Sequence, residues 1–230
     1  MTIAENVALV RENMDRAALA AGRDPKEILL LAATKMNDAD RVRQAIAAGV
    51  DLCGENRVQE MLEKQAQGAY AGVPLHFIGH LQKNKVKQVV GLAELIHGAD
   101  SLELLSLISR VAQVRGLTQD VLLEVNIGGE SAKSGFAPEE VPEALARAAA
   151  LPALRVRGLM AIPPVCAAPE ENRPFFLRMQ QLFIDNSEKK YDNIRMDFLS
   201  MGMSGDYTEA IACGANLVRV GSGIFGPRQY

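Results

Sequence analysis

The sequence predicts an α/β fold: a single (β/α)8 barrel of the TIM type with an extra N-terminal helix. Short runs rich in Val, Ile and Leu alternate with longer amphipathic segments along the whole chain, which is the pattern of repeated βα units. Eight such runs occur, and eight parallel strands in one domain of 230 residues are typical of a barrel. A helical pattern also precedes the first run, and only residues 224–230 are left after the last.

The eight strand candidates follow in order. They are residues 28–34, 51–54, 75–79, 95–98, 120–126, 154–162, 196–201 and 217–221. Between them, Asp38 and Ser101 are N-cap candidates for helices over 39–49 and 102–116, and Pro138 begins a helix over 139–150. Gly49 and Gly116 close the first two of these helices.

A doubly wound open sheet is the alternative architecture, because it uses the same alternation of strands and helices. The ends of the chain favour the barrel. Residues 224–230 are too few for an ordinary outer helix after the eighth strand, whereas residues 3–22 form a helix that can cover the gap. Apart from a loosely polar stretch at 167–173, no linker or change of composition divides the chain. We therefore expect one domain over residues 1–230.

Composition excludes several classes of protein. With 48% hydrophobic and 23% charged residues, the chain is neither disordered nor collagen-like. It has no apolar stretch of about 20 residues and no signal-peptide core, so we expect a cytoplasmic protein with no membrane partner. A net charge of −3 gives no general attraction to nucleic acid, and the basic segment 82–87 is interpreted as a solvated helix start. Three scattered cysteines form no disulfide framework and no metal site.

Lys35 ends the first apolar run, and it shares the alternation of Leu31 and Ala33. If those two side chains fill the barrel interior, Lys35 projects into the mouth at the C-terminal ends of the strands, where barrels build their sites. Apolar surroundings lower the pKa of a lysine, and the neutral amine attacks aldehydes. A surface lysine just beyond a strand is the alternative on this observation alone.

Glycine- and serine-rich segments follow the seventh and eighth strands. They contain Ser204, Gly221 and Ser222, and they lie where barrels commonly bind phosphate through backbone N–H groups and hydroxyls. Arg219 shares the alternation of Gly221 and enters the mouth beside them. An interior arginine needs an acceptor, and a structural carboxylate such as Asp197 or Glu55 is the alternative. A reactive lysine, a phosphate site and an arginine facing a ring nitrogen together describe a pyridoxal 5'-phosphate (PLP) pocket.

Six motifs in this order resemble the pyridoxal phosphate homeostasis protein family, relatives of the N-terminal barrel of alanine racemase. They are LLAATK (30–35), GENRVQE (54–60), HFIGHLQKNK (76–85), EVNIGGESAKSGF (124–136), LSMGMSGD (199–206) and VRVGSGIFG (218–226). The resemblance spans nearly the whole chain and implies a fold-type III barrel with PLP held as an internal aldimine at Lys35. It places Asn56 near the cofactor ring and Arg219 at the ring nitrogen. It also places four residues around the phosphate: Ser200, Ser204, Gly221 and Ser222.

Two functions are compatible with this pocket. The first is a carrier without catalytic residues that holds PLP on Lys35 and buffers or delivers it. The second is a small PLP-dependent racemase. Racemisation needs acid/base groups on both faces of the substrate carbon, and racemases of this fold take the opposing tyrosine from a second, β-rich domain. We expect no such domain in this protein. Among the four tyrosines, Tyr207 is the one candidate for that role. We expect the carrier.

The expected partners are PLP and free amino acids, which exchange with Lys35, and PLP-dependent enzymes in transient contact. Neither nucleic acid nor membrane is expected as a partner. The sequence leaves a monomer and a weak dimer both open. His76 and His80 flank a strand end with no carboxylate between them, so we expect hydrogen-bonded histidines and no metal site.

Overall fold

The protein is a closed barrel in a computed structural model that describes residues 1–188 and 191–227. All neighbouring strands are parallel, and the first also pairs with the last, so that Leu29 lies opposite Leu217. The strands are β1 (Leu29–Ala33), β2 (Leu52–Glu55), β3 (Leu75–Phe77), β4 (Leu95–Ala99), β5 (Gln119–Val125), β6 (Leu154–Ala161), β7 (Ile194–Met203) and β8 (Leu217–Val220). The pairing of β1 with β8 confirms the barrel and excludes the open sheet.

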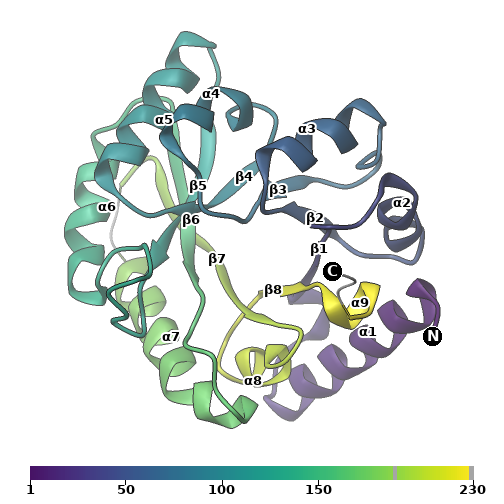
Figure 1. Cartoon of the computed structure of the whole chain (residues 1–230). Coiled ribbons are helices and arrows are strands. Elements are labelled where there is room, and N and C mark those ends of the chain that lie inside the picture. The colour runs from purple at the N-terminus through teal and green to yellow at the C-terminus, as the bar shows by residue number, and fades with distance from the viewer. Residues whose placement is uncertain (189–190, 228–230) are drawn as a thin grey trace.

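Helices form a ring around the strands (Figure 1). They are α1 (Ile3–Ala20), α2 (Ala39–Ala47), α3 (Val58–Ala66), α4 (Val86–Val89), α5 (Leu102–Val114), α6 (Val141–Ala149), α7 (Arg173–Ser187), α8 (Tyr207–Ala212) and α9 (Ser222–Phe225). Among the described residues that follow β8, only the short α9 is helical, and α1 packs against α8, α9 and α2. The expected closure of the ring by the N-terminal helix is therefore confirmed. None of the helices in the described part of the chain is long and apolar enough to cross a membrane.

Local signals set the helix ends. The Asp38 side chain accepts the backbone N–H of Arg41 at 2.8 Å, and the Ser101 hydroxyl accepts that of Leu104 at 3.3 Å, as expected for N-caps. Near Pro138 the sequence prediction was wrong in detail. Residues Pro138–Glu140 form a separate 3₁₀ turn, and the α-helix begins only at Val141.

Alternate residues of each strand face two different apolar layers. In β1, Leu30 and Ala32 belong to the large core between the strands and the helices. Leu31 and Ala33 belong to a small cluster inside the barrel, as the alternation predicts. A second interior cluster lies on the opposite side of the barrel, around Leu122. The interior of the barrel is therefore filled by side chains.

Candidate functional site

A cavity of about 610 Å³ lies at the C-terminal ends of the strands. Ligand sites in proteins commonly have volumes of about 300–1,000 Å³. Six of the seven residues that the sequence proposes as cofactor contacts line this cavity, namely Lys35, Asn56, Ser204, Arg219, Gly221 and Ser222. The seventh, Ser200, is fully buried and does not line it.

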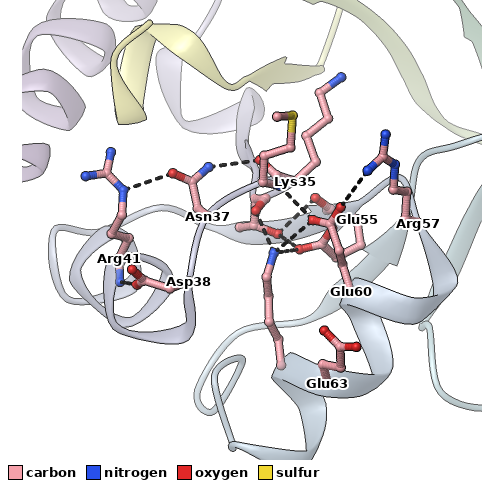
Figure 2. A network of polar contacts seen from close by, with 12 residues as sticks. Lys35, Asn37, Asp38, Arg41, Glu55, Arg57, Glu60 and Glu63 are labelled. Carbon is pink, nitrogen blue, oxygen red and sulfur yellow. Dashed lines mark hydrogen bonds and ion pairs between the residues drawn. The ribbon is translucent and has the colours of Figure 1, made fainter. Parts of the chain in front are cut away.

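Lys35 follows β1 directly and continues the inward-facing row of Leu31 and Ala33. Its side chain extends away from Glu55 and Glu60 (Figure 2) and contributes to the cavity wall. Arg219 contributes from a lower level, because β8 pairs with β1 so that Arg219 lies opposite Leu31. The cavity thus has an arginine near its base and a lysine nearer its mouth.

A buried ion pair holds the chain just before Lys35. The Lys64 ammonium of α3 lies 2.5 Å from Glu55 Oε1, and both side chains are almost completely buried. The same ammonium donates to the carbonyl of Thr34 at 2.7 Å, and the Thr34 and Tyr70 hydroxyls donate to Glu55 at 2.6 and 3.1 Å. Burial and the Glu55 carboxylate raise the pKa of Tyr70 well above its ordinary value, so Tyr70 stays a donor. The ion pair therefore anchors the end of β1.

A second contact holds the chain just after Lys35. Glu60 Oε2 accepts the backbone N–H of Met36 at 2.7 Å, and Met36 has a φ of 60°, which is unfavourable for a residue with a side chain. Glu60 also lies 3.5 Å from the Lys64 ammonium. Side chains of α3 therefore fix the backbone on both sides of Lys35, and the strained turn at Met36 depends on one of them.

Replacing Glu60 by alanine should loosen this turn. We expect a loss of about 1–3 kcal/mol in the free energy of unfolding, since a hydrogen bond to a charged acceptor disappears. We also expect faster hydrogen exchange at the Met36 amide. The matched control is Glu63→Ala, because Glu63 is an exposed carboxylate on the same helix. Equal effects of the two substitutions on Met36 exchange would contradict the assigned role of Glu60.

The β7–α8 and β8–α9 turns meet at Ser204. Its hydroxyl oxygen accepts the backbone N–H groups of Gly221 and Gly223 at 3.0 and 3.2 Å, so its proton can serve an acceptor in the cavity. Asp206 shapes the first turn by accepting the N–H of Met203 at 2.7 Å. These contacts fix the Ser204 hydroxyl on one wall of the cavity, where its proton suits an anionic group.

Arg41 joins this wall to the loop that carries Lys35. Its guanidinium donates to the Asn37 side chain at 2.9 Å and to the carbonyl of Phe225 in α9, while Asn37 donates to the carbonyl of Lys35 at 3.0 Å (Figure 2). Arg41 also lines the cavity, so it adds positive charge on the side of the serine and glycine turns. The sequence reasoning missed Arg41, although its place in the first turn of a helix after Lys35 was a usable signal.

Arg219 lies in the barrel interior and donates to Ser200 at 2.5 Å and to the carbonyl of Ala161 at 3.0 Å. Burial lowers the pKa of its guanidinium to about 10. The alternative carboxylate partners, Asp197 and Glu55, are instead paired with other cations. Ser200, which was expected beside the phosphate, therefore lies deeper in the barrel than Arg219. It is level with Leu217, below Arg219, because β7 pairs with β8 in that register.

Asn56 lines the cavity but keeps its side-chain acceptor buried. Its Oδ1 atom is inaccessible to solvent and has no hydrogen-bond partner among the described residues, although buried polar atoms are normally paired. The carbonyl of Asn56 packs closely against Gly79, where an added Cβ would lie 2.2 Å from the Asn56 oxygen. Asn56 is therefore held in place at the cavity wall. The lysine, the serine hydroxyls and the arginine that line the cavity fit PLP, which carries an aldehyde, a phosphate and a ring nitrogen.

The histidines do not form a metal site. His76 Nδ1 lies 3.0 Å from His97 Nε2 in the barrel interior, and His80 Nδ1 lies 3.1 Å from the Asp100 carboxylate. Hydrogen-bonded histidines were expected, and this is confirmed. In the described part of the chain, no group of three or more His, Cys, Asp or Glu side chains is arranged to hold a metal ion. His97 was missed, although a histidine alternating with Leu95 in an apolar run indicates an interior position.

Comparison with known proteins agrees with this architecture. Residues 5–229 match the family model described as alanine racemase, N-terminal domain. The pyridoxal phosphate homeostasis protein of Pseudomonas aeruginosa is 42% identical over 229 residues, which cover 100% of this chain and 97% of that protein. The one from Aquifex aeolicus is 40% identical over 230 residues, with 100% of both chains covered. PipY of Synechococcus elongatus, solved with PLP bound, is 31% identical with a TM-score of 0.83, covering 98% of this chain and 100% of that chain.

The fold and the lysine at the end of β1 define the class of protein: a barrel of the alanine racemase N-terminal type, also called fold-type III. Sequence identity of 42% and 40% with two relatives, over the whole length of this chain, narrows the assignment from this class to one family. The chain belongs to the pyridoxal phosphate homeostasis protein family.

Proposed function

We propose that this protein binds PLP through Lys35 and buffers or delivers it, without dedicated substrate turnover. One observation carries the proposal. A single cavity brings together Lys35, Arg219 and the Ser204 turn, which come from opposite ends of the chain. The solved PipY relative has PLP bound.

Each wall of the cavity suits one part of the cofactor. Lys35 would hold PLP covalently, since a lysine amine condenses with an aldehyde to give an imine and water. Arg219 donates to the ring nitrogen, and because it remains a cation at neutral pH, it keeps that nitrogen unprotonated. The hydroxyls of Ser204 and Ser222 donate to the phosphate, and Gly221, whose N–H donates to Ser204 at 3.0 Å, holds the Ser204 hydroxyl in place. Asn56 lies beside the ring at the cavity wall.

The positions of the tyrosines support a carrier over a racemase. Tyr207 lies toward the outer helices, where its hydroxyl accepts from Asn13 of α1 at 3.2 Å. Tyr70 donates to Glu55 in the core between the strands and the helices, and Tyr191 packs against the same core. None of these three tyrosines lines the cavity. The fourth tyrosine, Tyr230, lies outside the described residues. Racemisation needs an acid or base on the face opposite Lys35, and Tyr207 does not supply it.

The test is a titration of the cofactor-free protein with PLP, followed by absorption spectroscopy. We expect a visible band that saturates at one PLP per chain and that borohydride removes. Peptide mass spectrometry should then find one reduced adduct, on Lys35. Saturation without a reducible band, or an adduct distributed over surface lysines, would refute the assignment.

The same loaded protein decides between carrier and racemase. Incubated with common L-amino acids in deuterated water, it should produce neither Cα deuteration nor D-isomers at an enzyme-like rate, on the order of one turnover per second. Amino acids should nevertheless speed the release of PLP, since an incoming amine can replace Lys35. A PLP-dependent enzyme stripped of its cofactor should recover activity when mixed with the loaded protein. Racemisation that depends on Lys35 would favour the racemase function for this protein over the carrier function.

A further inference from the structure

A row of polar side chains crosses the apolar interior of the barrel beneath the cavity. It runs from Arg219 through Ser200 and His97 to His76. All four side chains are buried, with His97 and Ser200 completely inaccessible. The barrel interior otherwise holds the two apolar clusters around Leu31 and Leu122. A buried polar row of this kind is stable only if every member has a partner.

If every donor in the row has an acceptor, the hydrogen bonds of the row run in one direction. A guanidinium only donates, so Ser200 Oγ accepts from Arg219 at 2.5 Å. The Ser200 proton then needs an acceptor, and among the described residues the other polar atom that the hydroxyl contacts is His97 Nδ1, at 3.1 Å. His97 therefore carries its proton on Nε2 and donates it to His76 Nδ1 at 3.0 Å. His76 is in turn protonated on Nε2.

The surroundings agree with neutral histidines in this row. Burial lowers the pKa of His76 to about 4. Burial also lowers the pKa of His97 well below its ordinary value, and His76 and Arg219 add to the effect. The charged groups that act on the row are Asp120 on His76, and Glu124 and Asp206 on Arg219. The arrangement is therefore one of fixed tautomers, with the positive charge confined to Arg219.

We propose that His97, acting through Ser200, is a positioning residue for Arg219. By accepting the Ser200 proton, it turns a lone pair of the hydroxyl toward the guanidinium. Together with the carbonyl of Ala161, Ser200 then holds two N–H groups of Arg219 inside the barrel and leaves the others directed at the cavity. This inference rests on the proposed function, since the partner of those remaining N–H groups is the cofactor ring.

The first test uses the cofactor-free protein, so it does not depend on PLP. The chain has three histidines, and their ring nitrogens are resolved by long-range ¹H–¹⁵N NMR. We expect His76 and His97 to be Nε2-protonated tautomers that do not change between about pH 7.5 and about pH 6, close to the ordinary histidine pKa. Exposed His80 serves as the internal reference. A proton on His97 Nδ1 would overturn the proposal.

The second test compares two substitutions of His97. His97→Asn keeps an acceptor near the Nδ1 position, whereas His97→Leu removes it. We expect His97→Leu to shift the absorption band of bound PLP and to raise its dissociation constant on the order of tenfold, with borohydride still fixing PLP to Lys35. His97→Asn should restore most of both properties. Ser200→Ala should match His97→Leu, and the double variant should be no worse than either, because both break the same link.

A purely structural role for His97 would change stability without moving the spectrum, and that outcome would refute the proposal. Crystal structures of the cofactor-free His97→Leu protein should show Arg219 displaced from Ser200, and an unmoved Arg219 would refute it as well. If the wild-type protein takes up no PLP, the proposed function fails. The tautomers of the cofactor-free protein still decide whether His97 is linked to Arg219.

Discussion

Replacing Lys64 by methionine is expected to reduce the free energy of unfolding by about 3–5 kcal/mol, the range for a buried ion pair that loses one partner. The substitution keeps most of the side-chain volume. It leaves the Glu55 carboxylate, which is completely buried, without the ammonium now 2.5 Å away. The hydroxyls of Thr34 and Tyr70 still donate to Glu55, but they carry no compensating charge. Equilibrium unfolding in urea measures the loss.

Two further variants make the Lys64 experiment specific. Lys87→Met removes an exposed lysine of α4 and should change stability by no more than about 0.5 kcal/mol. Adding Glu55→Gln to Lys64→Met should recover part of the loss, because the buried negative charge is removed together with its partner. A loss below about 1 kcal/mol in Lys64→Met would show that the ion pair does not anchor the end of β1.

Lys64→Met should also weaken PLP retention, because the same ammonium donates to the carbonyl of Thr34, next to Lys35 in the chain. The effect on binding is separated from the effect on stability by measuring PLP retention at a temperature at which the variant is still folded. Retention equal to the wild type under those conditions would limit the role of Lys64 to stability.

Replacing Lys35 by alanine is expected to weaken PLP retention by at least about a hundredfold, equivalent to about 2.8 kcal/mol. The physical reason is the loss of the amine that forms the imine, while Arg219 and the Ser204 turn remain. Dialysis of the loaded protein followed by absorption spectroscopy measures the loss. Circular dichroism should show an unchanged fold, since the Lys35 side chain lines the cavity and is not part of the apolar core.

Lys133→Ala is the matched control for Lys35→Ala. Lys133 lies in the loop after β5, where its ammonium donates to the carbonyl of Pro163 at 3.2 Å and pairs with Glu130 at 2.5 Å. Its removal should leave the borohydride adduct on Lys35. A reduced adduct of wild-type yield in Lys35→Ala would show that another amine holds the cofactor, and it would refute the central role of Lys35.

The main features of the fold were predictable because they are local. The alternation in β1 placed Leu31 and Ala33 inside the barrel, and the caps at Asp38 and Ser101 depend on residues within one turn. Strand β7 was less predictable. It runs from Ile194 to Met203 and shifts register against both neighbours. Such irregularities arise from pairing with other strands, so the periodicity of one segment does not reveal them.

Within the candidate site, alternation predicted that Lys35, Arg219 and Gly221 point inward. It did not predict how deep each of them lies. Ser200 also points inward, yet it lies level with Leu217, below Arg219. Depth depends on the stagger between strands, which is a property of the closed barrel and of no single strand. For this reason the sequence placed Ser200 at the phosphate, and the structure places it behind the arginine.

The sequence by itself determined the barrel, the family, and the lysine and glycine-serine turns of the cavity, because strand periodicity, caps and motifs are encoded in neighbouring residues. Only the tertiary structure decided which side chains support them. Lys64 reaches Glu55, and His97 reaches Ser200, across 9 and 103 residues of chain. Their pairing follows from burial, since a charged or polar group inside the protein needs a partner, and the fold of the whole chain decides which residue supplies it.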